Sequence, residues 1–147
     1  MTFKKILVPV DYSDPSRRAL ELAVTLDPDA HVTVVHAWDR PSYVPDEVVA
    51  YHDGSRRSLS ELIRENAGRE MTEFLARSAT GTTKLEQRLL SGEPVTVILE
   101  EAAKHGYDLM VVGTRGRSGM TRLLLGSVTE KLIRLSPIPV LTVPPAH

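Results

Sequence analysis

The sequence predicts an α/β protein with a doubly wound sheet of five parallel strands and helices on both faces. Short apolar stretches rich in β-branched residues alternate with amphipathic stretches, which is typical of parallel strands joined by crossover helices. The chain of 147 residues has the length of one ordinary domain, so we expect a single domain over residues 1–147.

The composition excludes several classes of function. The 18 basic and 19 acidic residues give a net charge of −1, so we expect neither nucleic acid nor a membrane surface as a partner. The absence of cysteine excludes disulfides, thiol nucleophiles and cysteine-based zinc sites. The first apolar run is about five residues long, too short for a signal peptide or a membrane span, and we expect a cytoplasmic protein.

The start of the chain predicts two strands and the helix between them. The continuous apolar run Ile6–Val10 predicts a buried strand that ends at Asp11. A helix begins around residues 13–16, where serine, aspartate and proline stand in capping and first-turn positions, and residues 27–29 end it. The β-branched stretch His31–Ala37 predicts the second strand.

The middle of the chain is its least regular part. Residues 39–57 contain prolines, a glycine and mixed charge, and they predict a loop with room for a short helix around residues 46–50. From about Ser58, apolar residues at helical spacing predict a long amphipathic helix. Gly68 lies inside this helix and lowers its stability by about 1 kcal/mol relative to alanine.

The last part of the chain predicts three more strands. Residues 82–90 predict a strand at or near a sheet edge, and Pro94 takes the first position of the next helix. Asp108–Gly113 predicts the fourth strand, which a glycine-rich loop joins to a helix over residues 127–135. Residues 137–144 predict the fifth strand, and the prolines at both of its ends place it at an edge.

The loop Gly113–Ser127 has the composition of an anion site. It contains no acidic residue, and its glycines and basic residues are Gly113, Gly116, Gly119, Gly126, Arg115, Arg117 and Arg122. Glycine lets the backbone approach a ligand closely, and the following helix start offers unpaired N–H groups. The pattern is neither a GxxxxGK[ST] loop nor a GxGxxG turn. Since ligands of such sheets bind where the winding reverses, we expect Asp11 and this loop to face one crevice.

Each of these features also fits an interpretation without a ligand. Ser127 and Glu130 fit a capping box, which would satisfy the start of the last helix by side chains alone. Asp11 fits a cap for the first helix. The basic residues of the loop fit ordinary solvated charges, and this is the favoured interpretation for Arg122. The histidines show no paired spacing for a metal, and no GxSxG turn positions a nucleophile.

Several motifs occur together along the chain. They are Val8-Pro-Val-Asp11, Gly92-x-Pro94, Asp108–Gly113, Gly113-x2-Gly116-x9-Gly126-Ser127 and Gly126–Glu130. In this combination the whole chain resembles the ATP-binding branch of the universal stress protein family. The resemblance implies a five-stranded parallel sheet of order 3-2-1-4-5 and ATP, with Mg2+, as a ligand.

The resemblance also implies a role for individual positions. Asp11, with the backbone of Val10 and Ala37, would hold the adenine and the ribose. The residues that would follow the ribose and phosphates are Gly113, Thr114, Arg115 and Gly116. The residues that would donate N–H and hydroxyl groups to the phosphate chain are Gly126, Ser127, Val128 and Thr129. Pro9 and Val112 complete the expected cofactor-binding set, which contains no catalytic residue and no metal ligand.

Three kinds of function follow from this pattern. We expect an ATP-binding protein that uses the nucleotide as a regulatory ligand in a stress or signalling response. A slow ATPase or phosphotransferase is one alternative, but Asp11 is the only acidic residue expected near the site, so hydrolysis should be slow or absent. A nucleotide-free interaction module is another, and the complete loop motif argues against it.

The expected fifth strand bears on assembly. Its apolar edge would pair readily with another strand, and the resemblance implies a homodimer through residues 138–143. The prolines beside it offer the competing interpretation that they block such pairing.

Overall fold

The computed structural model describes residues 2–39, 48–50, 53–81, 85–114 and 125–145. Its main sheet has five strands in the order β5-β2-β1-β6-β7, and every neighbouring pair is parallel. These strands are β1 (Lys5–Pro9), β2 (His31–Trp38), β5 (Leu85–Ser91), β6 (Leu109–Gly113) and β7 (Val140–Val143). Numbered along the chain within this sheet, the order is 3-2-1-4-5, so the predicted arrangement is confirmed.

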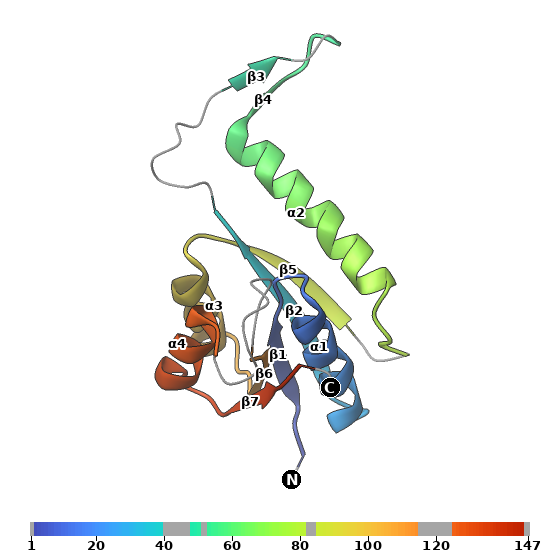
Figure 1. The fold of residues 1–147 in the computed structure, drawn as a ribbon, viewed down its shortest axis with the longest axis vertical. Coiled ribbons are helices and arrows are strands. Elements are labelled where there is room, and N and C mark those ends of the chain that lie inside the picture. The colour runs from blue at the N-terminus through green and yellow to red at the C-terminus, as the bar shows by residue number, and fades with distance from the viewer. Residues whose placement is uncertain (1, 40–47, 51–52, 82–84, 115–124, 146–147) are drawn as a thin grey trace.

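Four helices cover the two faces of the sheet (Figure 1). Helices α1 (Asp14–Leu26) and α2 (Leu59–Ala76) pack on the face that receives Ile6 and Val8 of β1. Helices α3 (Pro94–Lys104) and α4 (Ser127–Leu135) pack on the face that receives Leu7. Because side chains alternate along a strand, β1 supplies both cores, and its residues from Ile6 to Pro9 are buried at the centre of the sheet.

Three of the four helices are capped by the side chain of the residue just before their first residue. Ser13 accepts a hydrogen bond from the Ser16 amide at the start of α1, and Ser58 forms a capping box with Glu61 at the start of α2. Glu93 accepts hydrogen bonds from the amides of α3. At α4 the capping residue is Gly126, which has no side chain to offer. The predicted helix starts are confirmed in all four cases.

The segment between β2 and α2 differs from its prediction. Val48–Ala50 forms a strand, β3, which pairs antiparallel with β4 (Arg56–Ser58), so the expected short helix is wrong for residues 48–50. The reason lies in the turn: Gly54 adopts a φ of +88°, and the Asp53 carboxylate accepts hydrogen bonds from the amide and hydroxyl of Ser55. Figure 1 shows this hairpin beyond the first turn of α2, away from the main sheet. Residues 40–47 lie outside the described part of the chain.

The remaining elements follow the sequence closely. Both β5 and β7 form edges of the sheet, as predicted, although β7 begins only after Pro139. None of the helices in the described ranges has the length and apolar character needed to cross a bilayer.

Candidate functional site

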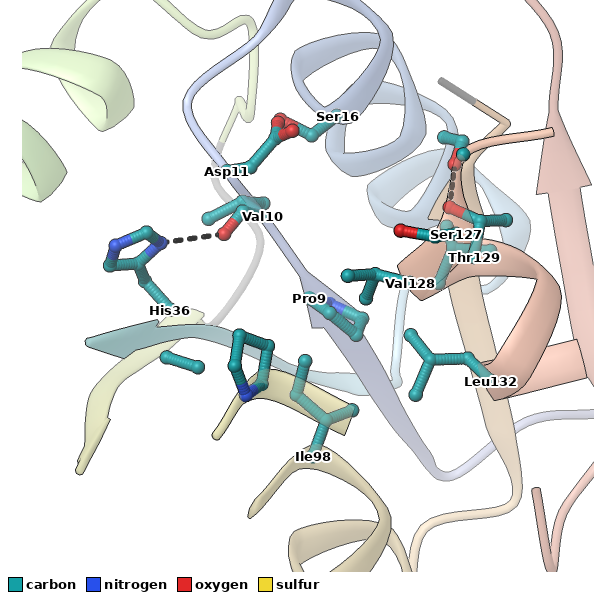
Figure 2. A pocket seen from close by; sticks show the side chains of 15 residues that line it. Pro9, Val10, Asp11, Ser16, His36, Ile98, Ser127, Val128, Thr129 and Leu132 are labelled. Atoms are coloured by element: carbon teal, nitrogen blue, oxygen red, sulfur yellow. Dashed lines mark hydrogen bonds between the residues drawn. The ribbon is translucent and has the colours of Figure 1, made fainter. Parts of the chain in front are cut away.

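A cavity of about 310 Å3 opens at the carboxyl ends of β1 and β6. These two strands are neighbours, and the chain continues from them to opposite sides of the sheet, so the cavity lies where the winding reverses. Ten of the residues predicted for the site line it: Pro9, Val10, Asp11, Ala37, Val112, Gly113, Gly126, Ser127, Val128 and Thr129. The structure therefore brings the end of β1 and the start of α4 into one space (Figure 2).

Among the predicted residues that the structure describes, Thr114 alone does not line this cavity. Thr114 instead joins the two ends of the glycine-rich loop to the sheet: its amide donates to the Val143 carbonyl at 3.1 Å, and its carbonyl accepts from the Gly126 amide at 2.9 Å. Arg115 and Gly116 lie outside the described residues.

Five lining residues were missed by the sequence analysis. They are Ser16, His36, Pro94, Ile98 and Leu132. Ile98 and Leu132 are buried helix residues, whose spacing predicts only that they belong to the core. His36 stands directly before the predicted Ala37, so the end of the second strand was the one signal that could have included it. Pro94, Ile98 and Leu132 give the cavity one apolar wall.

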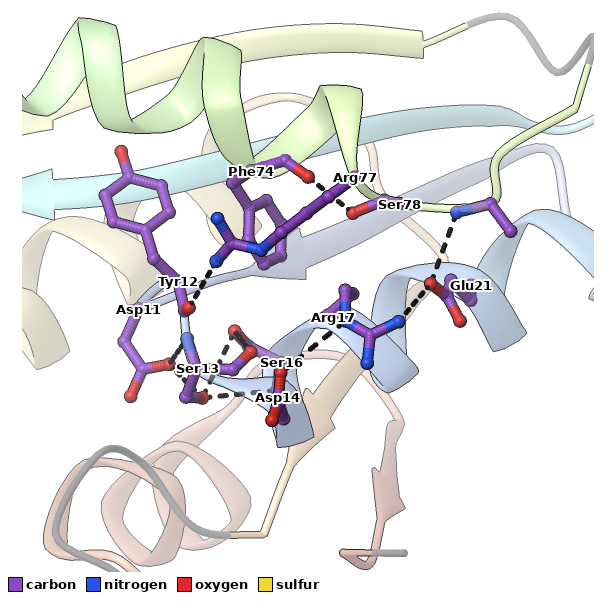
Figure 3. Close-up of polar contacts among 11 residues, drawn as sticks. Asp11, Tyr12, Ser13, Asp14, Ser16, Arg17, Glu21, Phe74, Arg77 and Ser78 are labelled. Carbon is purple, nitrogen blue, oxygen red and sulfur yellow. Dashed lines mark hydrogen bonds and ion pairs between the residues drawn. The ribbon is translucent and has the colours of Figure 1, made fainter.

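Asp11 is fixed by the turn that leads into α1 (Figure 3). Its Oδ1 accepts hydrogen bonds from the amide of Ser13, at 3.0 Å, and from the Ser13 hydroxyl. The Ser13 oxygen in turn accepts from the Ser16 amide at 3.3 Å. Asp11 therefore holds the capping residue, and the interpretation of Asp11 as the cap itself is wrong.

His36 holds the peptide group just before Asp11. Its Nδ1 lies 2.8 Å from the carbonyl oxygen of Val10. Because a carbonyl oxygen only accepts hydrogen bonds, Nδ1 is the donor and carries a proton. The half-buried imidazole thereby ties the end of β1 to β2 beside the cavity.

The start of α4 faces the cavity with unmatched donors. Gly126 is the capping residue and Ser127 is already helical, so the capping-box interpretation of Ser127 is wrong. The first hydrogen bond of this helix runs from the Glu130 amide to the Gly126 carbonyl, at 2.9 Å. The amides of Ser127, Val128 and Thr129 precede it and make no hydrogen bond to any described residue.

A side chain near the start of α4 holds this helix in place without accepting a hydrogen bond from its first amides. The Thr129 hydroxyl donates to the Gly113 carbonyl at 2.9 Å and so joins α4 to the end of β6. At α3, by contrast, Glu93 accepts from the amides of Val95 and Thr96 and from the Thr96 hydroxyl. These bonds, led by those from Thr96, hold the pKa of the Glu93 carboxyl below its usual value.

Gly113 has a role in packing that the sequence did not reveal. A Cβ atom at this position would lie 2.7 Å from the carbonyl carbon and 2.8 Å from the carbonyl oxygen of Pro15. The first turn of α1 therefore packs directly on the end of β6, and only glycine leaves room for it. This contact brings the start of α1 to the same cavity as the start of α4.

Comparison with known proteins places this geometry in a family. The model of the universal stress protein family matches residues 2–144. The chain belongs to the universal stress protein family. Universal stress protein MJ0531 of Methanocaldococcus jannaschii is 34% identical over 145 residues, which cover 96% of this chain and 82% of that protein.

Solved structures of universal stress proteins and similar chains share the fold. The structure of the protein MJ0577 has a TM-score of 0.78 and 24% identity, and the match covers 100% of this chain and 99% of that one. A universal stress protein solved in complex with cAMP has a TM-score of 0.60 and 27% identity, covering 97% of this chain and 98% of that one.

Proposed function

We propose that this universal stress protein binds an adenine nucleotide, ATP in the first place, as a regulatory ligand in a stress or signalling response. One observation carries the proposal: the cavity at the reversal point has the Asp11 carboxylate on one side and, on the other, three amides of α4 that make no hydrogen bond to a described residue. A nucleotide has an anionic part and a ribose with hydroxyl donors, which complement these two sides. The cAMP complex of a relative adds support.

The lining residues suggest how the two parts of the ligand would lie. Phosphate oxygens would accept hydrogen bonds from the amides of Ser127, Val128 and Thr129, where the helix dipole also favours negative charge. The ribose would reach Asp11, and the base would pack on the apolar wall near Val10 and Ala37. The proposed contacts of Arg115 and Gly116 stay predictions.

We propose that Mg2+ arrives with the phosphates. No group of three or more His, Cys, Asp or Glu side chains among the described residues could hold a metal ion by itself. Among the residues that the structure describes, Asp11 is the one carboxylate that lines the cavity. Slow or absent hydrolysis therefore stays the expectation for this site.

Binding measured by calorimetry tests the proposal. Titration of ATP in the presence of Mg2+ should give a saturable signal, and Asp11→Asn should weaken it because the neutral amide accepts less strongly from ribose hydroxyls. Asp29→Asn, an exposed aspartate in the turn after α1, is the matched control and should bind as the wild type does. A folded wild-type protein with no affinity at millimolar ATP would end this proposal.

We also propose a cytoplasmic homodimer built through β7. This strand forms an edge of the sheet, and its side chains Val140 and Leu141 are only partly buried in one copy. Pairing with a second β7 would satisfy its free edge. Light scattering at micromolar concentration should report a dimer, a monomer would contradict it, and cell fractionation checks the location.

A further inference from the structure

The residue after Asp11 has an unusual backbone. Tyr12 adopts a φ of +67°, the one positive value for a residue other than glycine among the residues described. A bulky side chain disfavours this conformation, which persists only where the surroundings hold it in place. In consequence, the Asp11 carboxylate and the Tyr12 ring leave the turn in different directions, one toward the start of α1 and the other toward α2 (Figure 3).

The Tyr12 side chain is held by α2 and β2. Its hydroxyl donates to the Ala67 carbonyl of α2 at 2.8 Å. Its ring stacks on the His36 ring at 4.3 Å between centroids and meets the Phe74 ring at 5.5 Å. With 7% of its surface exposed, the Tyr12 side chain is buried between the turn that follows β1 and helix α2.

Arg77, the capping residue just after α2, holds the Tyr12 backbone. Its Nη2 donates to the Tyr12 carbonyl at 2.9 Å, and its guanidinium lies 5.3 Å from the centre of the Phe74 ring. On the other side of Asp11, the Val10 carbonyl accepts from His36. The peptide group before Asp11 and the one between Tyr12 and Ser13 are therefore held by side chains from other elements, His36 of β2 and Arg77 just after α2.

We propose that Tyr12 and Arg77 are positioning residues, through which the seating of α2 on the sheet sets the orientation of Asp11 and so the affinity for the nucleoside. The inference rests on the proposed nucleotide function and adds a means of regulating it. A partner that shifts α2 or the β3–β4 hairpin at its start would change nucleotide affinity. By linkage, bound nucleotide would change the affinity for that partner by the same factor.

Substitution of Arg77 separates positioning from general stability. Arg77→Met keeps a long unbranched side chain but removes every donor and the charge beside the Phe74 ring, whereas Arg77→Lys keeps the charge and an ammonium donor. Dissociation constants for adenosine and for ATP, measured well below the unfolding temperature, should rise by one common factor of about five or more in Arg77→Met. Arg77→Lys should recover part of this loss, and Arg69→Met, at an exposed arginine of α2, should change neither constant.

A second measurement needs no ligand. In the amide NMR spectrum of the ligand-free protein, Arg77→Met should shift the Asp11 and Ser13 signals, and Arg69→Met should leave them in place. Tyr12→Phe removes only the hydroxyl and should also weaken adenosine binding. This variant provides the test if the Arg77 variant does not fold.

The outcomes distinguish the two proposals. If wild-type protein binds ATP and Arg77→Met binds adenosine and ATP within twofold of it, the positioning role is wrong and the nucleotide function stands. The positioning role is also wrong if Arg77→Met lowers only the unfolding temperature. If the wild type binds neither ligand, the proposed function itself falls, together with the inference that depends on it.

Discussion

The two ends of the parallel sheet differ in how their polar groups are satisfied. At the end where strands begin, the chain completes its own hydrogen bonds. The Asp108 carboxylate accepts from the amides of Lys4 and Lys5, at 2.8 and 3.3 Å. The Lys5 ammonium donates to the His105 carbonyl at 2.6 Å and lies over the Tyr107 ring.

The same end contains a buried acidic side chain with partners. Glu101 of α3 is 5% exposed, and its Oε2 accepts from the Tyr107 hydroxyl and from Arg88 Nη1, both at 2.8 Å. The Thr33 hydroxyl is the exception within the described ranges, since it is buried without a hydrogen-bond partner. A largely closed network of this kind stabilises the fold and leaves little for a ligand to bind.

At the end where the strands stop, the start of α4 has no side-chain cap, whereas α1 and α3 are capped by Ser13 and Glu93. The first three amides of α4 lack partners among the described residues and face the cavity that Asp11 also lines. The polar groups of this chain therefore serve different purposes at the two ends of the sheet: they complete the fold at one and line a cavity at the other. Substitutions at the starting end should alter stability alone, and substitutions at the stopping end should alter binding.

Removal of the buried carboxylate should give the largest effect. Glu101→Ala leaves the Tyr107 hydroxyl and the Arg88 guanidinium without their acceptor and should lower the free energy of unfolding by about 3 kcal/mol. ATP affinity of the folded fraction should not change. Chemical denaturation measures the loss, and Glu100→Ala, at the exposed neighbouring position, should cost less than about 0.5 kcal/mol. A changed dissociation constant in Glu101→Ala would break the division between the two ends.

Gly113 should behave as a fold residue although it lies at the ligand end. Gly113→Ala places a Cβ 2.7 Å from the Pro15 carbonyl carbon and should lower the free energy of unfolding by about 2 kcal/mol. Gly68→Ala is the control: the new Cβ would meet only the Leu89 side chain, at 3.6 Å, and should stabilise the helix by about 1 kcal/mol. Equal stabilities for the two variants would show that the α1 contact is looser than described.

The two helix starts beside the cavity offer a direct contrast. Ser13→Ala removes the cap of α1 and should lower the free energy of unfolding by about 1 kcal/mol. Ser127→Ala removes no cap, because Gly126 occupies that position, and should change stability by less than about 0.3 kcal/mol. Thermal unfolding without nucleotide measures both, and a similar loss in Ser127→Ala would restore the capping box.

The smallest predicted effect is a dependence of stability on pH, which comes from Tyr107 and appears only above neutral pH. Burial, with smaller contributions from Glu101, raises the pKa of Tyr107 from 10.0 to about 12. The folded state thus keeps its proton where the unfolded state loses it, so this contribution to stability is full below pH 10 and is lost as the pH rises toward 12. Unfolding followed between pH 9 and 12 should show the decline in the wild type and a weaker one in Tyr107→Phe. Identical profiles would contradict the assignment.

The sequence predicted the sheet order and the helix starts because their signals are local or come from the motifs that carry the resemblance. Ser13 and Pro94 stand where a cap and a first turn require them. It failed at Val48–Ala50, where three-residue strands leave too short a pattern, and the Asp53–Gly54 turn was the available signal.

The site was predicted only in part for a different reason. The pattern of Ser127 and Glu130 fits a capping box equally well, and only the fold shows that the helix starts with Gly126 as its cap. The contact between Gly113 and Pro15, and the place of Ile98 and Leu132 in the cavity wall, depend on residues far apart in the chain. The support of Tyr12 by Arg77 is likewise a tertiary contact without a sequence signature.

The most direct test of nucleotide binding at the stopping end of the sheet is an amide NMR titration with ATP and Mg2+. Binding at this site should give saturable shifts at Asp11, Ala37, Ser127, Val128 and Thr129, and should leave Lys4, Lys5 and Tyr107 unchanged. No saturable shift at millimolar ATP, or shifts confined to the end where the strands begin, would contradict it.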